Sequence, residues 1–426
     1  MDNSLTAISA LEAGFDTLII SKKDGAVKDV RTQSFETFKS LGFPGKKTEA
    51  YKYSPVDKFI EKNIDYLQVN DAFGLSKEEV QQHFYDLPGT HLVFANGTFS
   101  SELSLIKSED VTINTIDEDN PSEMLETLTG EHDAFAALNA AFFSTGLQIL
   151  ANNKKIRPQV FIYYVFDLRN GQICSFPRLN IEVAELCEID LVEKLVFVGE
   201  GTLFHNVTTE IKIGKNATLN LTKNQVYADN HIVVDGIYAH QRRDSKIYFN
   251  TFSFSGAMVR NNLNIAQNDE HCESYMNGLY LLDGNSHVDN NTAIDHKQPH
   301  SYSNELYKGV VDDKSRGVFN GKIYVRPGAQ QTNAFQANNN ISLSDAAIVN
   351  TKPQLEIWAD DVKCSHGCTI GQLDEEAIFY LRARGLSEIS AKAMMLVAFA
   401  EDTLNHVPVE QVKEEVATII ENRLGQ

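Results

Sequence analysis

The sequence has few cysteines and no long apolar segment, and these two absences narrow the classes of protein to consider. Five cysteines in 426 residues are an odd number and too few for a disulfide framework, so we expect reduced thiols. No run approaches the roughly 18 consecutive apolar residues that cross a bilayer, and Met1–Ser4 lack the pattern of a secretory signal. We therefore expect a soluble, cytoplasmic protein.

Basic residues and nucleotide-binding motifs are also scarce. Lys and Arg number 38 against 58 Asp and Glu, a formal charge of -20, which argues against nucleic acid or an anionic membrane as the main partner. The sequence has no GxxxxGK phosphate loop, no GxGxxG after a strand and no GxSxG elbow. Nucleotide hydrolysis, dinucleotide chemistry and serine hydrolysis therefore lack a motif, and any ATP chemistry must come from a partner.

The residue pattern that is present divides the chain into three regions. Residues 1–157 are expected to be mainly helical, with helices over Ser34–Leu41, which stops at Gly42, and over Asp133–Phe143, which Gly146 would cap. Residues 158–371 change to short β-branched and aromatic runs separated by Gly, Asn and Asp, which indicates strands. Residues 372–426 return to a helical pattern.

The β region fits two architectures. Its clearest predicted strands are Glu210–Gly214, Ala217–Leu221, Lys246–Thr251, Gly321–Val325 and Ile341–Leu343. Short strands joined by polar turns suit a parallel β-helix, and a sandwich almost as well. Because no strict repeat period is visible, the residues alone leave both open.

Three helices are predicted in the last region. Asp374 is a candidate N-cap for a helix through Leu381, with Gly385 as its C-terminal cap. A second helix starts at Ser387 and ends before Pro408, and a third covers Val409–Leu424. The second helix has an apolar face at helical spacing, formed by Ile389, Ala393, Leu396, Val397, Ala400 and Leu404.

The most chemically suggestive segment is Cys364–Cys368, with the sequence Cys-Ser-His-Gly-Cys. In a strand, Cys364 and His366 project from one face, where a thiolate and an imidazole can share a soft metal or a sulfur intermediate. Cys368 joins them only if Gly367 folds the chain back. From the residues alone, a buried, inert cysteine is favoured, since free Cys is among the most buried residue types.

Other polar residues give weaker signals. His287, His296 and His300 lie near three aspartates, a composition that suits a metal, although such side chains are more often solvated or hydrogen-bonded. His271 and Cys272 are similarly ambiguous. The three aspartates are Asp283, Asp289 and Asp295.

Four runs in the second half of the chain resemble one known family, and three shorter segments before them resemble it more weakly. The runs are Tyr307–Ile323, Ala329–Ala334, Thr351–Gly367 and Gly371–Leu386, and the shorter segments are Gly42–Pro44, Glu49–Tyr53 and Phe135–Asn139. They are similar to the SufB/SufD family of iron-sulfur cluster assembly scaffold proteins. The shorter segments resemble the SufD branch of the family in particular, and the chain length suits SufD better than the longer SufB.

The resemblance implies a right-handed parallel β-helix between helical ends, in a non-enzymatic scaffold of the SUF (SufBCD) complex. It implies two partners: the ATPase SufC, and either SufB or a second copy of the chain. Cys364 and His366 match residues at the SufB interface, where a transient iron-sulfur cluster assembles, and no stably bound cofactor is expected. Cys368 stands where the family commonly has alanine. The SufC-binding region maps to Leu373, Phe379, Tyr380, Leu381, Leu396 and Phe399.

Three other interpretations stay open at this stage. The chain could be a SufB-like subunit, or a passive scaffold that supplies no ligands. It could also be a β-helix carbohydrate-active enzyme, with Asp283, Asp289 and Asp295 as its acids and Arg316 or Arg326 as its charge stabiliser, although only the fold class supports that assignment.

Overall fold

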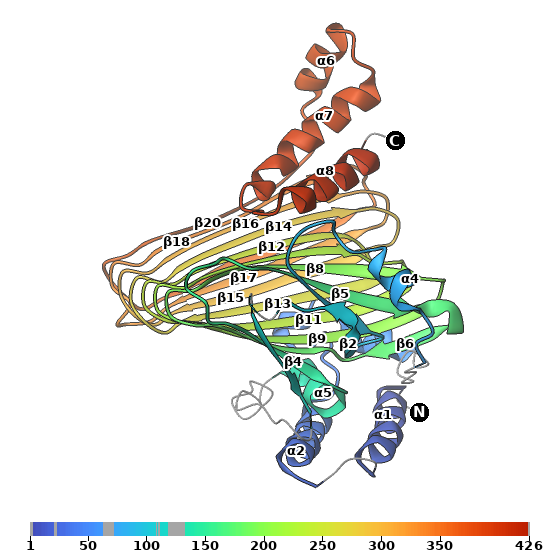
Figure 1. The fold of residues 1–426 in the computed structure, drawn as a ribbon. Helices are drawn as coiled ribbons and strands as arrows, with labels where there is room; N and C mark the ends of the chain where they lie inside the picture. The colour runs from blue at the N-terminus through green and yellow to red at the C-terminus, as the bar shows by residue number, and fades with distance from the viewer. Residues whose placement is uncertain are drawn as a thin grey trace.

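The computed structural model describes residues 3–20, 24–62, 72–107, 109, 111–117 and 133–424, and two β-sheets dominate it (Figure 1). We call them sheet A and sheet B. Sheet A contains, in spatial order, β2 (Thr98–Leu105), β1 (Thr90–Ala95), β5 (Gln159–Asp167), β8 (Glu188–Val198), β10 (Thr218–Val226), β12 (Lys246–Ser255), β14 (Glu273–Leu282), β16 (Tyr302–Val311), β18 (Asn333–Ser342) and β20 (Lys363–Gly371). Sheet B contains β19 (Ile348–Ile357), β17 (Arg316–Val325), β15 (His287–His296), β13 (Met258–Gln267), β11 (His231–Gln241), β9 (Thr202–Ile213), β7 (Arg178–Val183), β4 (Gly146–Ala151) and β3 (Thr112–Ile116), and β6 (Gln172–Ser175) pairs with β9.

The two sheets form a β-solenoid. From β8 to β20 the chain alternates between sheet A and sheet B, and neighbouring strands in each sheet are parallel. A sandwich is built from antiparallel strands, so this topology excludes it and confirms the β-helix. It also confirms the five predicted strands, each of which is longer than the sequence indicated.

The length of a solenoid turn varies along the chain. Along one row of sheet A the paired residues are Thr218, Lys246, Glu273, Tyr302, Asn333 and Lys363, so successive turns take 28, 27, 29, 31 and 30 residues. This variation explains why the sequence shows no strict repeat. Within each strand, alternate side chains point into the solenoid and pack into one apolar core, as do Phe319, Ile323 and Val325 of β17.

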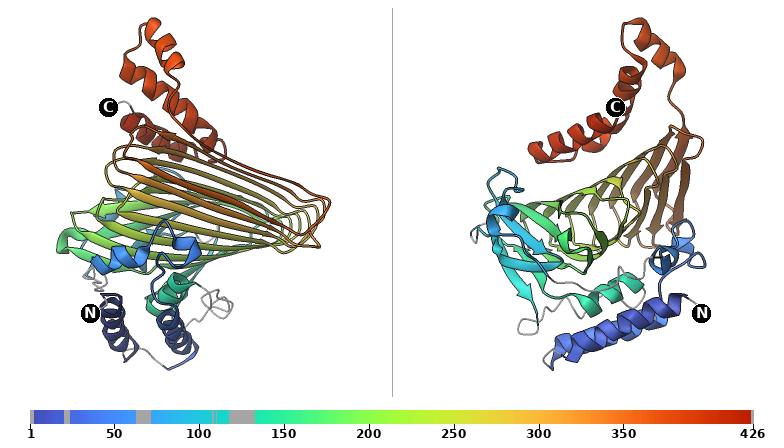
Figure 2. Two further views of the ribbon diagram at one scale, coloured as in Figure 1. Left: turned by 180° about the vertical axis from the view of Figure 1, so that it is seen from behind. Right: turned by 90° about the vertical axis from the view of Figure 1, so that its right-hand side faces the viewer.

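The N-terminal helices lie against sheet B on the side away from the C-terminal helices (Figure 2), except α4 (Lys77–Gln81), which packs against sheet A. Here Phe35 and Phe135 pack with Phe204 of β9 and Met258 of β13. The helical elements of this part are α1 (Asn3–Ile20), α2 (Ala26–Leu41), η1 (Glu49–Tyr51), α3 (Val56–Lys62), α4 (Lys77–Gln81), α5 (Ala134–Phe142) and the later turn η5 (Leu168–Asn170).

The sequence predictions for this part are confirmed except in one detail. The helices over Ser34–Leu41 and Asp133–Phe143 exist as parts of α2 and α5, and Asp133 caps α5 by accepting from the Phe135 backbone N–H at 2.9 Å. The assignment of Gly146 as a helix cap was wrong, because Gly146 begins β4. Both sheets also extend into residues 1–157, since β1 pairs with β5 and β4 with β7. The domain boundaries at 157 and 371 stay predictions.

Three helices and a short turn follow the solenoid, and the N-cap predicted for the first helix is present. They are α6 (Glu375–Ala383), α7 (Glu388–Glu401), η6 (Asp402–Leu404) and α8 (Glu410–Leu424). Asp374 and Ser387 cap α6 and α7, and Gly385 follows α6 with a φ of 99°. The end of α7 and α8 pack on sheet A, whereas α6 and the start of α7 rise away from it (Figure 1). On the predicted apolar face, Leu396 and Ala400 of α7 and Leu404 of η6 are buried, whereas Ile389 at the start of α7 is exposed.

Candidate functional site

The last turn of the solenoid ends in a surface that no further strand of the described chain covers. β19 and β20 are the outermost strands of sheet B and sheet A, so each has a parallel neighbour on one side only. Ile370 of β20 points to the interior side, like its buried register partner Asn340, yet Ile370 is 55% exposed. We call the surface formed by β19 and β20 the terminal face.

Cys364, His366 and Cys368 form a row on the terminal face. All three lie in β20, and their alternation directs them to the interior side of sheet A. The prediction that Cys364 and His366 share a face is confirmed. Gly367 lies within the strand and does not fold the chain back, so Cys368 continues the row.

The spacing in this row determines which side chains can share an ion. At about 3.3 Å per residue, the Cα atoms of neighbours in the row lie about 7 Å apart, and two such side chains can converge on one metal. The Cα atoms of the two cysteines lie about 13 Å apart, which is too far for their thiols to bind one ion. Among the residues that the structure describes, no three His, Cys, Asp or Glu side chains gather closely enough to hold a metal.

The two thiols differ in their surroundings. Cys364 is half-buried and packs against the apolar core of the solenoid, and burial raises the pKa of its thiol. Cys368 and His366 are exposed. A buried thiol with a raised pKa is a weak nucleophile until a cation or a hydrogen-bond donor approaches it. Cys364 therefore becomes a thiolate only when such a group approaches it.

Behind His366 lies a polar row that sequence analysis missed. Gln336 of β18 is the register partner of His366, and Glu305 of β16 is the partner of Gln336. The side-chain Nε2 of Gln336 donates to Glu305 Oε2 at 2.6 Å, inside the solenoid. The sequence around both residues has the pattern of ordinary strands. Because the solenoid turns differ in length, no sequence interval predicts that the two residues align with His366.

The predicted partner-binding residues separate into two groups. Phe379 and Tyr380 on α6 are 75% and 57% exposed, whereas Leu396 on α7 is 3% exposed within the core between α7, α8 and sheet A. Leu373 and Phe399 are half-buried against this same core, and Leu381 is half-buried on α6. Of these six residues, only Phe379 and Tyr380 offer a largely exposed apolar surface.

The aspartates proposed for a carbohydrate-active enzyme do not converge. Asp289 forms a buried ion pair with Arg260 at 2.5 Å, and Asp295, six residues or about 20 Å along the same strand, pairs with Arg326 at 2.7 Å on the outer face. Asp283 lies elsewhere, beside Arg423 at 3.4 Å. Three separated and paired carboxylates cannot act as an acid and base on one glycosidic bond.

The candidate histidines have structural partners. His287 is buried and shares a hydrogen bond of 2.8 Å with Ser54 Oγ, and His296 Nε2 lies 2.9 Å from Ser303 Oγ inside the solenoid. His271 and His300 stack at 4.9 Å on neighbouring turns, where both backbones have positive φ. Cys272 is buried, and burial raises its pKa to about 11.

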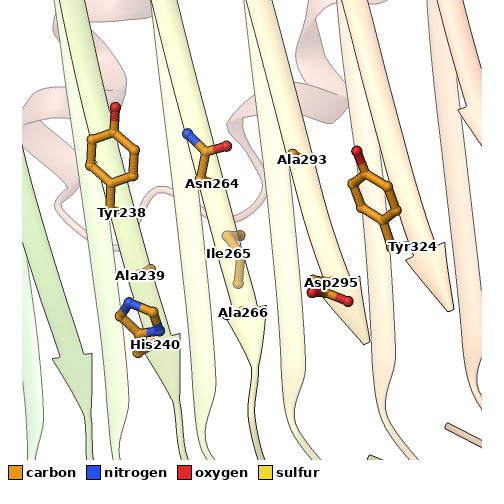
Figure 3. Close-up of a pocket in the computed structure, with 9 residues that line it drawn as sticks. All are labelled: Tyr238, Ala239, His240, Asn264, Ile265, Ala266, Ala293, Asp295 and Tyr324. Carbon is orange, nitrogen blue, oxygen red and sulfur yellow. The ribbon is translucent and has the colours of Figure 1, made fainter. Parts of the chain in front are cut away.

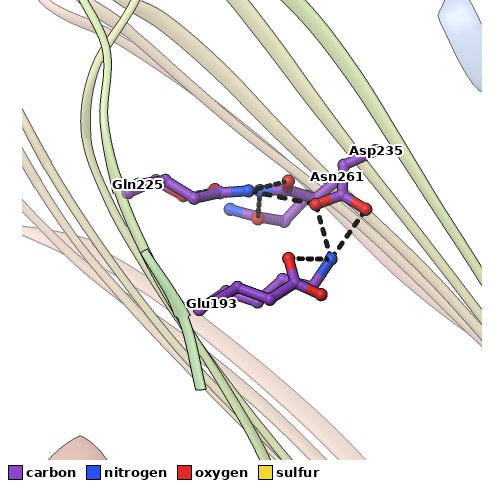
Figure 4. A network of polar contacts seen from close by, with 7 residues as sticks. Glu193, Gln225, Asp235 and Asn261 are labelled. Atoms are coloured by element: carbon purple, nitrogen blue, oxygen red, sulfur yellow. Dashed lines mark hydrogen bonds and ion pairs between the residues drawn. The ribbon is translucent and has the colours of Figure 1, made fainter. Parts of the chain in front are cut away.

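Two further polar features lie away from the terminal face. A groove on the outer face of sheet B is walled by Tyr238 and Tyr324, with Asn264 and Ala293 between them (Figure 3). Inside the solenoid, the buried Lys223 ammonium bonds Asp235 at 2.7 Å and Glu193 at 3.1 Å, beside Gln225 and Asn261 (Figure 4). The Lys223 cluster is enclosed by both sheets, and within it Glu193 Oε1 has no hydrogen-bond partner among the described residues.

Comparisons with known proteins agree with the sequence resemblance. Residues 166–399 match the family model "SUF system FeS cluster assembly, SufBD core domain", and residues 10–160 match "SufBD protein N-terminal region". The chain is 28% identical over 403 residues to the iron-sulfur cluster assembly protein SufD of Escherichia coli, covering 92% of each chain. It is 29% identical to a SufBD family protein of Synechocystis, covering 93% of this chain and 89% of the relative. No helix in the described residues is long and apolar enough to span a membrane.

Proposed function

Since this chain belongs to the SufBD family of iron-sulfur cluster assembly proteins, we propose that it is a non-enzymatic scaffold on whose terminal face a cluster is assembled. The observation that carries the proposal is the row of Cys364 and His366 on the uncovered end of the solenoid. Thiolate and imidazole are established ligands of iron-sulfur centres. Such a site handles the cluster as cargo, which must be able to leave.

A second solenoid subunit, either SufB-like or another copy of the chain, is the proposed partner at the terminal face. The outer edges of β19 and β20 lack a paired strand within the described chain, and their inward side chains are half-buried on β19 and mostly exposed on β20. Open strand edges with free N–H and C=O groups favour pairing with another sheet. A partner there would cover Ile370 and bring further ligands to Cys364 and His366.

The protruding helical hairpin is the proposed docking site of the ATPase SufC. Phe379 and Tyr380 expose large aromatic surfaces on α6, and Ile389 is exposed at the start of α7. Exposed aromatic clusters of this kind mark protein interfaces. Lys308 of β16 connects the hairpin to the solenoid, because its Nζ bonds the Phe399 carbonyl and the Asp402 carboxylate, both at 2.7 Å. ATP-driven movement of SufC would therefore reach the strands that end at the terminal face.

Two single substitutions test the assigned site. In a reconstituted complex with the SufB-type and SufC-type partners, Cys364→Ser and His366→Ala should each slow cluster formation by about tenfold or more, measured by visible absorption. The matched control is Ser365→Ala, which changes the residue between them on the opposite face of the strand and should leave the rate unchanged. Cytosolic conditions suit this role because Cys364 must stay reduced.

The outcome separates an active scaffold from a passive one. If both variants still bind their partners and assemble clusters at the wild-type rate, the chain contributes no ligand and acts only as a structural support. If both lose assembly while still binding their partners, the ligand role holds.

A further inference from the structure

The carboxamide of Gln336 has one unused hydrogen-bonding atom, and Gln336 is the register partner of His366 on the neighbouring strand β20. Gln336 is 3% exposed and gives its Nε2 to Glu305, but its Oε1 has no hydrogen-bond partner among the described residues. A buried amide oxygen without a partner is destabilising, so such atoms call for an explanation. The next residue on the same interior row of sheet A is His366.

The surroundings hold Gln336 in place. Glu305 is 1% exposed, and its Oε2 accepts the Gln336 amide at 2.6 Å. On the opposite sheet, Gly321 leaves room for the amide, because a Cβ at position 321 would overlap the Gln336 side-chain nitrogen. The amide is therefore held in one position, with its nitrogen engaged by Glu305 and its oxygen available, and the register partner of Gln336 on β20 is His366.

A histidine that binds a metal usually donates its second ring N–H to an acceptor behind it. That bond selects the tautomer, orients the ring and strengthens the metal bond. Neutral imidazole has one N–H and one lone pair, so an acceptor on the interior side leaves the lone pair for the outer side. Gln336 Oε1 is such an acceptor, with Glu305 as its support.

We infer that Gln336, fixed by Glu305, is the positioning residue for His366 and directs one ring nitrogen of His366 toward iron on the terminal face. This inference rests on the proposed function, because it assigns a ligand role to His366. Removing the amide oxygen should weaken the metal bond without removing any ligand.

The test uses the full chain with cobalt(II) as the only added metal. Gln336→Met keeps the side-chain length but removes the amide, and it should weaken cobalt binding by about 10- to 100-fold. Glu305→Gln keeps an acceptor for the Gln336 amide and should bind within about threefold of wild type. Gln354→Leu is the matched control, because it removes an amide from the outward face of β19, and it should change nothing. Gln336→Asn, whose shorter amide cannot reach, is a second variant should Gln336→Met fold poorly.

A spectroscopic readout separates positioning from a general packing role. Pulsed electron paramagnetic resonance of the remote ring nitrogen reports its hydrogen bond, and the signal should change in Gln336→Met but not in Glu305→Gln. Wild-type affinity and signal in Gln336→Met, with binding lost in His366→Ala, would overturn the inference and leave the proposed function standing. Wild-type cobalt binding in His366→Ala would overturn both.

Discussion

Phe379 and Leu396 offer a sharp contrast on the proposed SufC-binding helices. Both belong to the set of residues that the sequence resemblance assigns to partner binding, but Phe379 is 75% exposed and Leu396 is 3% exposed. Phe379→Ala should change the free energy of unfolding by no more than about 0.5 kcal/mol, because little buried surface is lost. If Phe379 is an interface anchor, the same change should weaken SufC binding by about 2 kcal/mol, or roughly 30-fold.

Leu396→Ala should do the reverse. Its side chain packs with Ala400, Val412 and Val416 between the C-terminal helices and sheet A, and truncating a buried leucine costs about 2–5 kcal/mol. Part of any loss in SufC binding would then follow from loosening of α7. Urea unfolding, hydrogen exchange of α7 and calorimetric titration with SufC measure the three quantities.

Two results would refute this reasoning. A stable Leu396→Ala variant, within about 0.5 kcal/mol of wild type, would mean that α7 does not pack on sheet A as the structure describes. A Phe379→Ala variant that binds SufC normally would remove Phe379 from the proposed interface. Met394→Ala removes another exposed side chain, on α7, and comparing its SufC binding with that of Phe379→Ala shows how the effect depends on position in the hairpin.

Three further predictions concern the solenoid and its cysteines. Arg260→Leu should lower the free energy of unfolding by about 3–5 kcal/mol in urea melts, because it leaves the Asp289 carboxylate buried and unpaired, and Arg260→Leu with Asp289→Leu should recover much of the loss. Burial lowers the pKa of His287 to about 3, so at lower pH the unfolded chain binds a proton that the folded chain does not. The free energy of unfolding should therefore decrease as the pH drops below about 6.5, by up to about 1.4 kcal/mol per pH unit. A His287→Gln variant with an equally steep pH dependence would contradict this. Iodoacetamide should alkylate exposed Cys368 first and leave buried Cys272 unmodified in the folded chain, as peptide mass spectrometry will show; early labelling of Cys272 would contradict the fold.

Several features followed from the sequence because they depend on neighbours a few residues apart. The cap at Asp374 and the helix start at Ser387 are each predicted from one side chain and the helical pattern that follows it. The shared face of Cys364 and His366 needs only the two-residue alternation of a strand. Family resemblance added the β-helix and the iron-sulfur assembly role, which the composition alone left open. Gly146 was misassigned because a glycine after a helix can equally begin a strand, as it does in β4.

The terminal face, by contrast, is a property of the whole solenoid. The sequence by itself determined the local elements, the paucity of cysteines and the thiol and imidazole in one strand. Only the tertiary structure decided that β20 is the last strand, that Leu396 is buried while Phe379 is free, and that Glu305 and Gln336 stand behind His366. The physical reason is that each of these depends on contacts between residues about one solenoid turn or more apart. Because successive turns differ in length, no fixed sequence interval identifies the residues that meet.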